Sequence, residues 1–338
     1  MAQKKDLFYG HSLKGKSRAI VELIVDAYNT TGKKSRLYIG DGGLATYLNT
    51  GLVDAGVLDV CEFSHLAYPS TVLKAMSMLY MPNDEGAWEK PTPEFLSGET
   101  HAYVIYEGAT VMKQWLMGNN EGAIADKISK GEKFGGVRDD GGSLVTTDGK
   151  VNGVPDEWRK HGQITGLHYM KAYRELESAI QRSSAFAGNV IWTAHPTEAP
   201  DLTEGGRSGQ HGQIQGKKVI GPDVCGKARA ATISALFGNT LHFDTAMKTG
   251  HREQDALTGQ NISILEPEYR VYTRDHYDPD GLEMVEFRAG CRYDGMKLFY
   301  THNEPGKSIL DFYVDLQKKA QDTATRFTKG GENLTQKS

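Results

Sequence analysis

A short glycine-containing segment near the N-terminus constrains the fold of this chain more than any other feature. Residues 10–17 read Gly-His-Ser-Leu-Lys-Gly-Lys-Ser, so a glycine and four varied residues precede Gly-Lys-Ser. This spacing is the P-loop pattern, which is significant only where it lies between a buried strand and a helix. Both are predicted here, because residues 7–9 are apolar and the residues after Arg18 repeat at helical spacing, with one face formed by Ala19, Ile20, Leu23, Ile24 and Ala27.

The residue types in this segment suit a bound phosphate. Gly10 and Gly15 allow the backbone to turn tightly, so that consecutive N–H groups face an anion, and the helix that begins near Lys16 adds its positive end. Lys16 is expected to reach the β- and γ-phosphates, and the Ser17 hydroxyl to ligate Mg²⁺. A glycine-rich turn that matches the pattern by chance is the alternative. The predicted ligands are ATP and Mg²⁺, and the predicted nucleotide-binding residues are Gly10, His11, Ser12, Leu13, Lys14, Gly15, Lys16, Ser17 and Arg18.

The composition of the chain narrows the classes of protein to which it can belong. Its 338 residues include 39 Lys and Arg against 43 Asp and Glu, a net charge of −4, so any contact with nucleic acid needs a local basic patch. The three cysteines, Cys61, Cys225 and Cys291, are far apart, which predicts neither disulfides nor a zinc site. No signal peptide and no apolar run of membrane-spanning length is visible, so we expect no membrane contact.

Two further apolar runs are predicted to be strands that end near acidic residues. Residues 37–39 lead to Asp41, and residues 101–106 lead to Glu107. A carboxylate at the end of a buried strand can hold the water shell of Mg²⁺, and Glu107 is the better candidate for this Walker-B-like role, although Asp is the usual residue. The alternative interpretations are a turn residue for Asp41 and a surface acid for Glu107.

The remaining segments predict a chain in which strands and helices alternate. Buried strands are expected at residues 57–63, 190–195 and 240–244, and helices at residues 70–80, 166–186, 227–237 and 308–327. Residues 269–274 and 284–289 alternate around a turn signal at residues 278–281 and are predicted to pair as a hairpin. Irregular structure is expected at residues 82–98, 118–162 and 199–226, which are rich in Gly, Pro or charge, and in the tail, residues 328–338. Turn signals within 118–162, among them residues 139–142, also suggest one hairpin.

This order of parts resembles the RecA-like ATPases. It is most similar to the small phage-encoded, Sak-type members that accompany single-strand annealing proteins. The resemblance covers roughly residues 6–295, and the P-loop is the one motif in it that is specific alone. It implies an α/β fold with a RecA-like P-loop NTPase core, a mainly parallel central sheet flanked by helices, and a C-terminal β-hairpin and helix. The implied division is an ATPase domain at residues 1–300 with insertions near 82–98 and 118–162, a helix at 301–327 and a disordered tail at 328–338. The chain departs from the family at His11 and Leu13, and in having Glu107 where Asp is usual.

The resemblance also implies roles for individual residues. Asp41 corresponds to the acid that polarises the attacking water, and His195, at the end of a predicted strand, to the sensor of the γ-phosphate. Arg274 and Arg292 correspond to basic residues that reach a neighbouring subunit's γ-phosphate as arginine fingers. Ordinary surface arginines and a packed histidine are the alternatives. The implied catalytic set is Lys16, Asp41, Glu107, His195, Arg274 and Arg292.

The implied function is ATP binding and hydrolysis coupled to single-stranded DNA in phage recombination, repair or replication. Arg207, Lys217 and Lys218 lie where the family places a DNA-contacting loop, and scattered charges on a surface loop are the alternative. The resemblance further implies a homo-oligomer, a ring or filament, in the host cytoplasm, with a phage annealing or single-strand-binding protein as a partner. Two other functions stay open: a module that binds nucleotide without hydrolysing it, and a motor or packaging ATPase that works with a protein partner.

Overall fold

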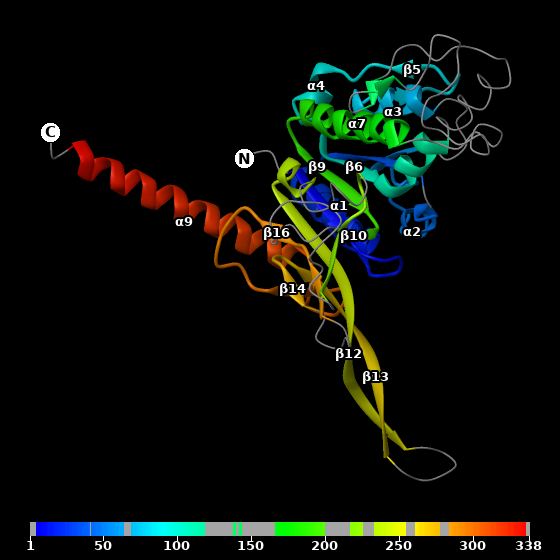
Figure 1. Cartoon of the computed structure of the whole chain (residues 1–338). Helices are drawn as coiled ribbons and strands as arrows, with labels where there is room; N and C mark the ends of the chain where they lie inside the picture. The colour runs from blue at the N-terminus through cyan, green and yellow to red at the C-terminus, as the bar shows by residue number, and fades with distance from the viewer. Residues whose placement is uncertain are drawn as a thin grey trace.

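The fold is built on a mixed, mostly parallel sheet with helices on both faces (Figure 1). In the computed structural model, the described residues are 5–40, 42–63, 69–118, 138–139, 142–143, 166–199, 217–225, 233–254, 261–277 and 284–335. Five adjacent strands pair in parallel in the order β1, β9, β6, β2 and β3. Their bounds are Lys5–Tyr9, Asn189–Ala194, His101–Glu107, Lys34–Ile39 and Leu58–Glu62. This confirms an α/β fold with parallel strands at its centre.

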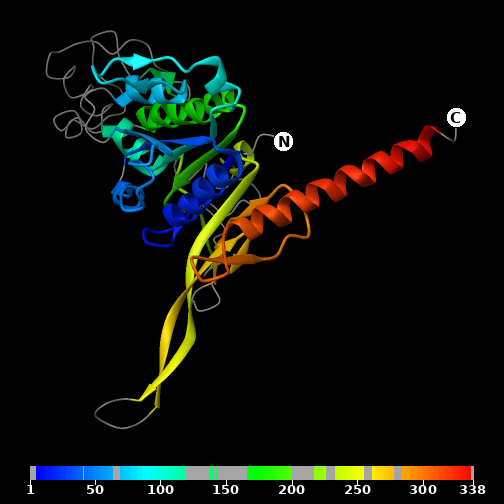
Figure 2. The same ribbon diagram turned by 180° about the vertical axis from the view of Figure 1, so that it is seen from behind.

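The other side of β1 carries the antiparallel part of the sheet. Strand β12 (Asn239–Gln254) pairs with β1 in parallel and with β13 (Asn261–Tyr272) antiparallel. Strand β17 (Phe299–His302) then pairs with β13, and β16 (Gly290–Cys291) with β12. Beyond residue 244, β12 and β13 leave the sheet as a two-stranded ribbon that projects from the body (Figures 1 and 2). The ribbon consists of residues 245–254 and 261–268.

Alternation along the central strands divides the core into two layers. On one face, Leu7 and Tyr9 pack with α3 (Pro69–Ser77), a helix over residues 109–118, and α7 (Gly166–Arg182). On the other face, Phe8 packs with α1 (Lys16–Thr31), α2 (Leu44–Leu48) and the start of α9 (Leu310–Thr335). Helix α1 buries the predicted face, Ala19, Ile20, Leu23, Ile24 and Ala27, together with Val21.

Several predictions for the irregular segments are wrong. Residues 82–98 are not a loop throughout, because β4 (Met81–Pro82) pairs with β5 (Trp88–Glu89), and α4 (Pro93–Leu96), capped by Thr92, buries Phe95. Within 118–162, β7 (Arg138–Asp139) pairs with β8 (Gly142–Ser143), in agreement with the hairpin that the turn signals suggest. Residues 119–137, 140–141 and 144–162 lie outside the described residues. The described part of the predicted helix at 227–237 contains only a 3-10 turn, η2 (Ile233–Leu236). A second 3-10 turn, η1 (Ser183–Ala185), follows α7.

The predicted C-terminal hairpin is also wrong. Residues 269–272 belong to β13 and pair with β12 and β17, whereas β15 (Met284–Phe287) pairs with β11 (Lys217–Pro222) and β14 (His276–Tyr277). With β10 (Pro196–Ala199), these three strands make a small second sheet. Alternation identifies a strand but not its partner, so the pairing could not be deduced from the pattern. The sequence analysis placed Lys217 and Lys218 in a loop, but these two residues begin β11.

The C-terminal helix is longer than predicted. Helix α9 continues to Thr335, past the predicted end at Phe327, so most of the tail expected to be disordered is helical. Its first turns bury Phe312, Tyr313 and Leu316, and the remainder extends away from the body (Figure 2). In the described part of the chain, no helix is both long and apolar enough to cross a membrane.

Candidate functional site

The candidate residues gather at one edge of the sheet, where three parallel strands end. Gly10 follows β1, His195 follows β9, and Glu107 ends β6. Strand β9 lies between the other two, and the end of β9 is tied to β6 because the Gly108 N–H donates to Thr193 Oγ1 at 2.9 Å. In open α/β sheets, ligands bind at this carboxyl edge.

The 10–17 segment joins β1 to α1 through a backbone that requires its two glycines. Gly10 has φ 153°, and a Cβ atom there would collide with the carbonyl oxygen of Phe243. Gly15 has φ 86°, and a Cβ atom would lie 2.7 Å from Cε1 of His302. Leu13 also has a positive φ, 64°, and its side chain is 93% exposed, an unfavourable conformation for a leucine that is typical of functional loops.

Lys16 folds back over this segment. Its ammonium donates hydrogen bonds to the carbonyl oxygens of Gly10, at 2.7 Å, and His11, at 2.9 Å. The side chain is half-buried at the N-terminus of α1, where the helix dipole and free N–H groups favour an anion. A phosphate placed there would offer this ammonium a charged acceptor in addition to two neutral ones, and hydrogen bonds to charged acceptors are the stronger kind.

Glu107 connects the segment to the rest of the site. Its carboxylate is 3% exposed, and the Ser17 hydroxyl donates to Oε1. The Tyr47 hydroxyl, on α2, donates to Oε2. The predicted neighbours Ser17 and Glu107 are therefore in direct contact. The sequence analysis missed Tyr47, because a single tyrosine in the short segment Leu-Ala-Thr-Tyr-Leu gives no motif.

Lys14 points away from the centre of this group. Its ammonium forms an ion pair with Asp244 Oδ1 at 2.8 Å and donates to Thr245 Oγ1 at 2.6 Å. Thr245, Tyr269 and His302 are register partners on β12, β13 and β17, and Gly15 packs against the last two. The 10–17 segment therefore rests on one row of residues at the root of the ribbon. The contacts of Lys14 favour a structural role over the predicted contact with nucleotide.

His195 is positioned mainly through its backbone. Its N–H donates to Thr110 Oγ1 at 2.9 Å, and its carbonyl accepts from the Asp223 N–H at 2.7 Å. The buried ammonium of Lys113, on the helix that follows Glu107, pairs with the Asp223 carboxylate. The strand end of β9 is thus fixed to the helix after β6 and to the small sheet, and the half-buried imidazole lies at the edge of the site.

Two of the predicted arginines are not brought to this group. Arg274 follows β13 and Arg292 follows β16, and both are exposed at a different part of the sheet from Glu107. Arg18, His11 and Ser12 are exposed around the 10–17 segment. Asp41 and Arg207 lie outside the described residues, as do the side chains of Lys217 and Lys218.

The donors present suit magnesium held together with a phosphate. The described ranges contain no group of three or more His, Cys, Asp or Glu side chains that could hold a metal by themselves. Mg²⁺ ordinarily takes one or two protein oxygens and completes its octahedron with water and substrate phosphate oxygens. The adjacent oxygens of Ser17 and Glu107 fit that requirement.

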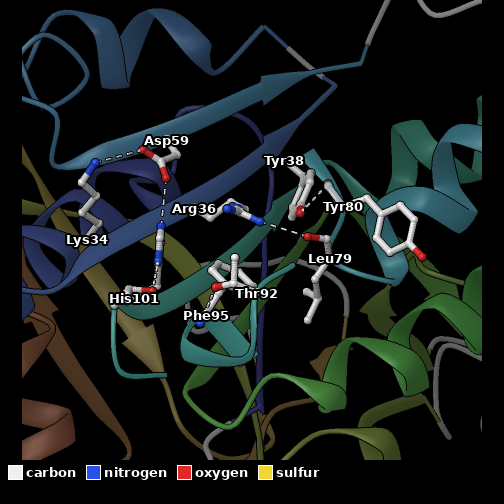
Figure 3. A network of polar contacts seen from close by, with 10 residues as sticks. Lys34, Arg36, Tyr38, Asp59, Leu79, Tyr80, Thr92, Phe95 and His101 are labelled. Carbon is white, nitrogen blue, oxygen red and sulfur yellow. Dashed lines mark hydrogen bonds and ion pairs between the residues drawn. The ribbon is translucent and has the colours of Figure 1, made fainter. Parts of the chain in front are cut away.

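A second polar cluster lies at the opposite edge of the sheet (Figure 3). Asp59 accepts from His101 at 2.9 Å and lies 3.7 Å from the Lys34 ammonium. Burial raises the pKa of Asp59, but the hydrogen bond from His101 and the Lys34 charge outweigh it, so the net shift is downward. Because these residues lie at the amino ends of β2, β3 and β6, we interpret the cluster as a structural tie between strands.

Comparison with known protein families and curated proteins adds no assignment of function to this geometry. No known protein family matches the chain. The sequences of curated proteins give no match either. Any assignment of function therefore rests on the residues described above.

Beside the site, two buried histidines are held neutral. His302 is fully buried, neither of its ring nitrogens has a hydrogen-bond partner, and burial lowers its pKa to about 4. Burial, with smaller contributions from His276 and nearby cations, also lowers the pKa of His242 well below its ordinary value. Both side chains favour the folded state only while they are uncharged.

Acid is therefore expected to destabilise the fold. Between the ordinary histidine pKa of 6.5 and the folded value of about 4, the unfolded chain binds more protons at His302, so the free energy of unfolding decreases as the pH falls through this range. His302 alone contributes about 3 kcal/mol to this loss. Urea unfolding across the range should show a smaller pH dependence for His302→Leu than for the parent. Equal slopes for the two proteins would contradict the assignment.

Proposed function

We propose that this protein is a magnesium-dependent P-loop ATPase of the RecA-like type that acts on single-stranded DNA. The observation that carries the proposal is the hydrogen bond from Ser17 to Glu107, since it joins the glycine-rich segment to the acidic strand end with β9 between them. A P-loop hydroxyl and a strand-end carboxylate that face each other form the protein's half of a magnesium–nucleotide site.

In this proposal, each group has a defined task. The N–H groups of the P-loop and the Lys16 ammonium bind the phosphates, and Ser17 and Glu107 hold Mg²⁺ and its water. Mg²⁺, when bound, would neutralise charge that develops on the transferred phosphoryl group. Strand β2, which leads to Asp41, pairs with β6, and Ile39 and Glu107 are register partners. This adjacency supports Asp41 as the residue that orients the attacking water, with His195 as the sensor of the γ-phosphate.

The DNA-binding part of the proposal depends on the segment after His195. Strand β10 begins at Pro196 and pairs with β11, which begins with Lys217 and Lys218. A conformational change at His195 could therefore reach Lys217 and Lys218 through the paired strands β10 and β11. Acidic residues balance these cations locally, so we expect contact with DNA to be weak in one subunit and to require several subunits of a homo-oligomer side by side.

A specific feature favours the second candidate function, an ATPase that works with a protein partner. The ribbon of β12 and β13 exposes Met247 and Leu265 on one face, at 57% and 56%. Their register partners are Pro267 and Thr249, so the four side chains share that face. Exposed apolar side chains that are contiguous are typical of protein-binding surfaces.

An ATPase assay with and without single-stranded DNA distinguishes these functions. We expect the parent to hydrolyse ATP faster with DNA, and the triple variant Arg207→Ala, Lys217→Ala, Lys218→Ala to lose that stimulation while binding ATP normally. Three lost phosphate contacts would reduce the salt slope of DNA binding by about 2, at roughly 0.7 for each phosphate. Lys318→Ala on α9 is the control for a surface cation. Turnover indifferent to DNA would favour the protein-partnered ATPase, and binding without turnover would favour a nucleotide-binding module.

A further inference from the structure

We propose that Tyr47 is a positioning residue that fixes the Glu107 carboxylate for magnesium. The inference rests on the proposed function and adds a residue for which no motif exists. It is carried by one juxtaposition: the two oxygens of Glu107 receive hydroxyl hydrogen bonds from two different elements, Ser17 on α1 and Tyr47 on α2.

Tyr47 is fully buried, and its hydroxyl points to one carboxylate. It is the buried residue of the short helix α2, with no exposed surface, and it belongs to the core layer that contains α1. Other fully buried tyrosines of the sheet, Tyr38 and Tyr106, donate to the backbone carbonyls of Tyr80 and Met76 on the opposite side. Tyr47 instead directs its hydroxyl to the carboxylate that we assign to the metal.

The chemistry of a magnesium site explains why such a contact is useful. Mg²⁺ requires near-ideal octahedral geometry, and a carboxylate free to rotate holds the bound water poorly. With Oε2 engaged by Tyr47, the carboxylate plane is fixed and Oε1 faces Ser17, the hydroxyl expected to ligate the metal. Hydrogen bonds to a metal's carboxylate from outside the ligand set typically affect metal affinity or activity by 10–100-fold.

The position of α2 gives the contact a second consequence. Helix α2 begins at Leu44, soon after β2 ends, and the intervening residues include Asp41, the proposed water-orienting acid. The Tyr47 hydroxyl therefore ties the metal carboxylate to the chain segment that carries the other catalytic acid.

The test compares two conservative variants that each remove one buried hydroxyl. Tyr47→Phe keeps the ring in the core, and Tyr38→Phe is the matched control, since its hydroxyl donates to the Tyr80 carbonyl at 2.8 Å. Binding of ATPγS is measured by calorimetry at increasing Mg²⁺, and again with EDTA. For Tyr47→Phe we expect the half-saturating Mg²⁺ concentration to rise roughly 10-fold or more, with metal-free binding unchanged. Tyr38→Phe should match the parent in both.

Each other outcome has a defined meaning. If the parent itself binds ATPγS without regard to Mg²⁺, the proposed function fails before Tyr47 is tested. If the parent depends on Mg²⁺ and Tyr47→Phe has the same dependence, the positioning role is refuted. Equal shifts in both variants, or a Tyr47→Phe protein that no longer unfolds cooperatively, would assign the hydroxyl to packing and overturn the inference. In a Glu107→Gln background, Tyr47→Phe should cause no further shift, since the two residues act together.

Discussion

Lys16→Ala is expected to abolish binding of Mg²⁺–ATP while leaving the fold intact. The Lys16 ammonium, at the N-terminus of α1, donates hydrogen bonds to the carbonyl oxygens of Gly10 and His11, which are neutral acceptors. Each hydrogen bond to a charged group contributes about 1.5–3 kcal/mol, so loss of two or more phosphate contacts should weaken binding by roughly 100-fold or more. The side chain is not part of the core, and alanine is the best helix former, so α1 should persist.

Calorimetric titration with ATPγS and Mg²⁺ measures this effect, and thermal unfolding verifies the fold. Lys33→Ala is a matched control, because its ammonium also donates to a backbone carbonyl, that of Gly98 at 2.6 Å, but lies beyond the other end of α1. A folded Lys16→Ala protein with parental affinity would remove the basis for a P-loop and leave the 10–17 segment as a glycine-rich turn.

The parts of the fold that could be predicted are those specified by local patterns. The strand and helix around the 10–17 segment are specified within one stretch of chain, by a buried apolar run and a helical repeat. Glu107 was identified for the same reason, since it ends β6 directly after a run of mostly apolar residues. The acidic end of a strand and the P-loop hydroxyl meet because parallel strands share their carboxyl edge, a rule that needs no knowledge of individual contacts.

What could not be predicted depends on partners distant in sequence. Strand β12 was expected to end at Asp244, because residues 244–254 contain few apolar side chains and show no apolar alternation. No described residue of α9 after Leu316 is buried, so this part of the helix has the composition of a solvated tail. The sequence alone therefore does not distinguish it from a disordered segment. Lys14 had been assigned to the nucleotide from the motif alone, whereas its acceptors, Asp244 and Thr245, are more than two hundred residues away.

Glu107→Gln is expected to reduce metal-dependent ATP turnover by about 100-fold. The amide preserves the size of the side chain, but it removes the negative charge that would hold the water shell of Mg²⁺. It also replaces one acceptor with a donor, so Ser17 and Tyr47 can no longer both donate to this group. Asp41→Asn, in contrast, should slow turnover while sparing binding of Mg²⁺–ATP, because the proposed acid acts on the attacking water and not on the ground state.

Steady-state turnover at saturating ATP and several Mg²⁺ concentrations separates these effects. Glu62→Gln provides the control, since Glu62 ends β3, which β2 separates from β6, and is exposed. More Mg²⁺ should partly restore turnover in Glu107→Gln if the defect lies in holding the metal, and should not help Asp41→Asn. Parental turnover in Glu107→Gln would mean that another carboxylate holds the metal. The buried contacts of Glu107 would then serve only to join α1 and α2, and the Ser17 hydroxyl would need a different metal partner.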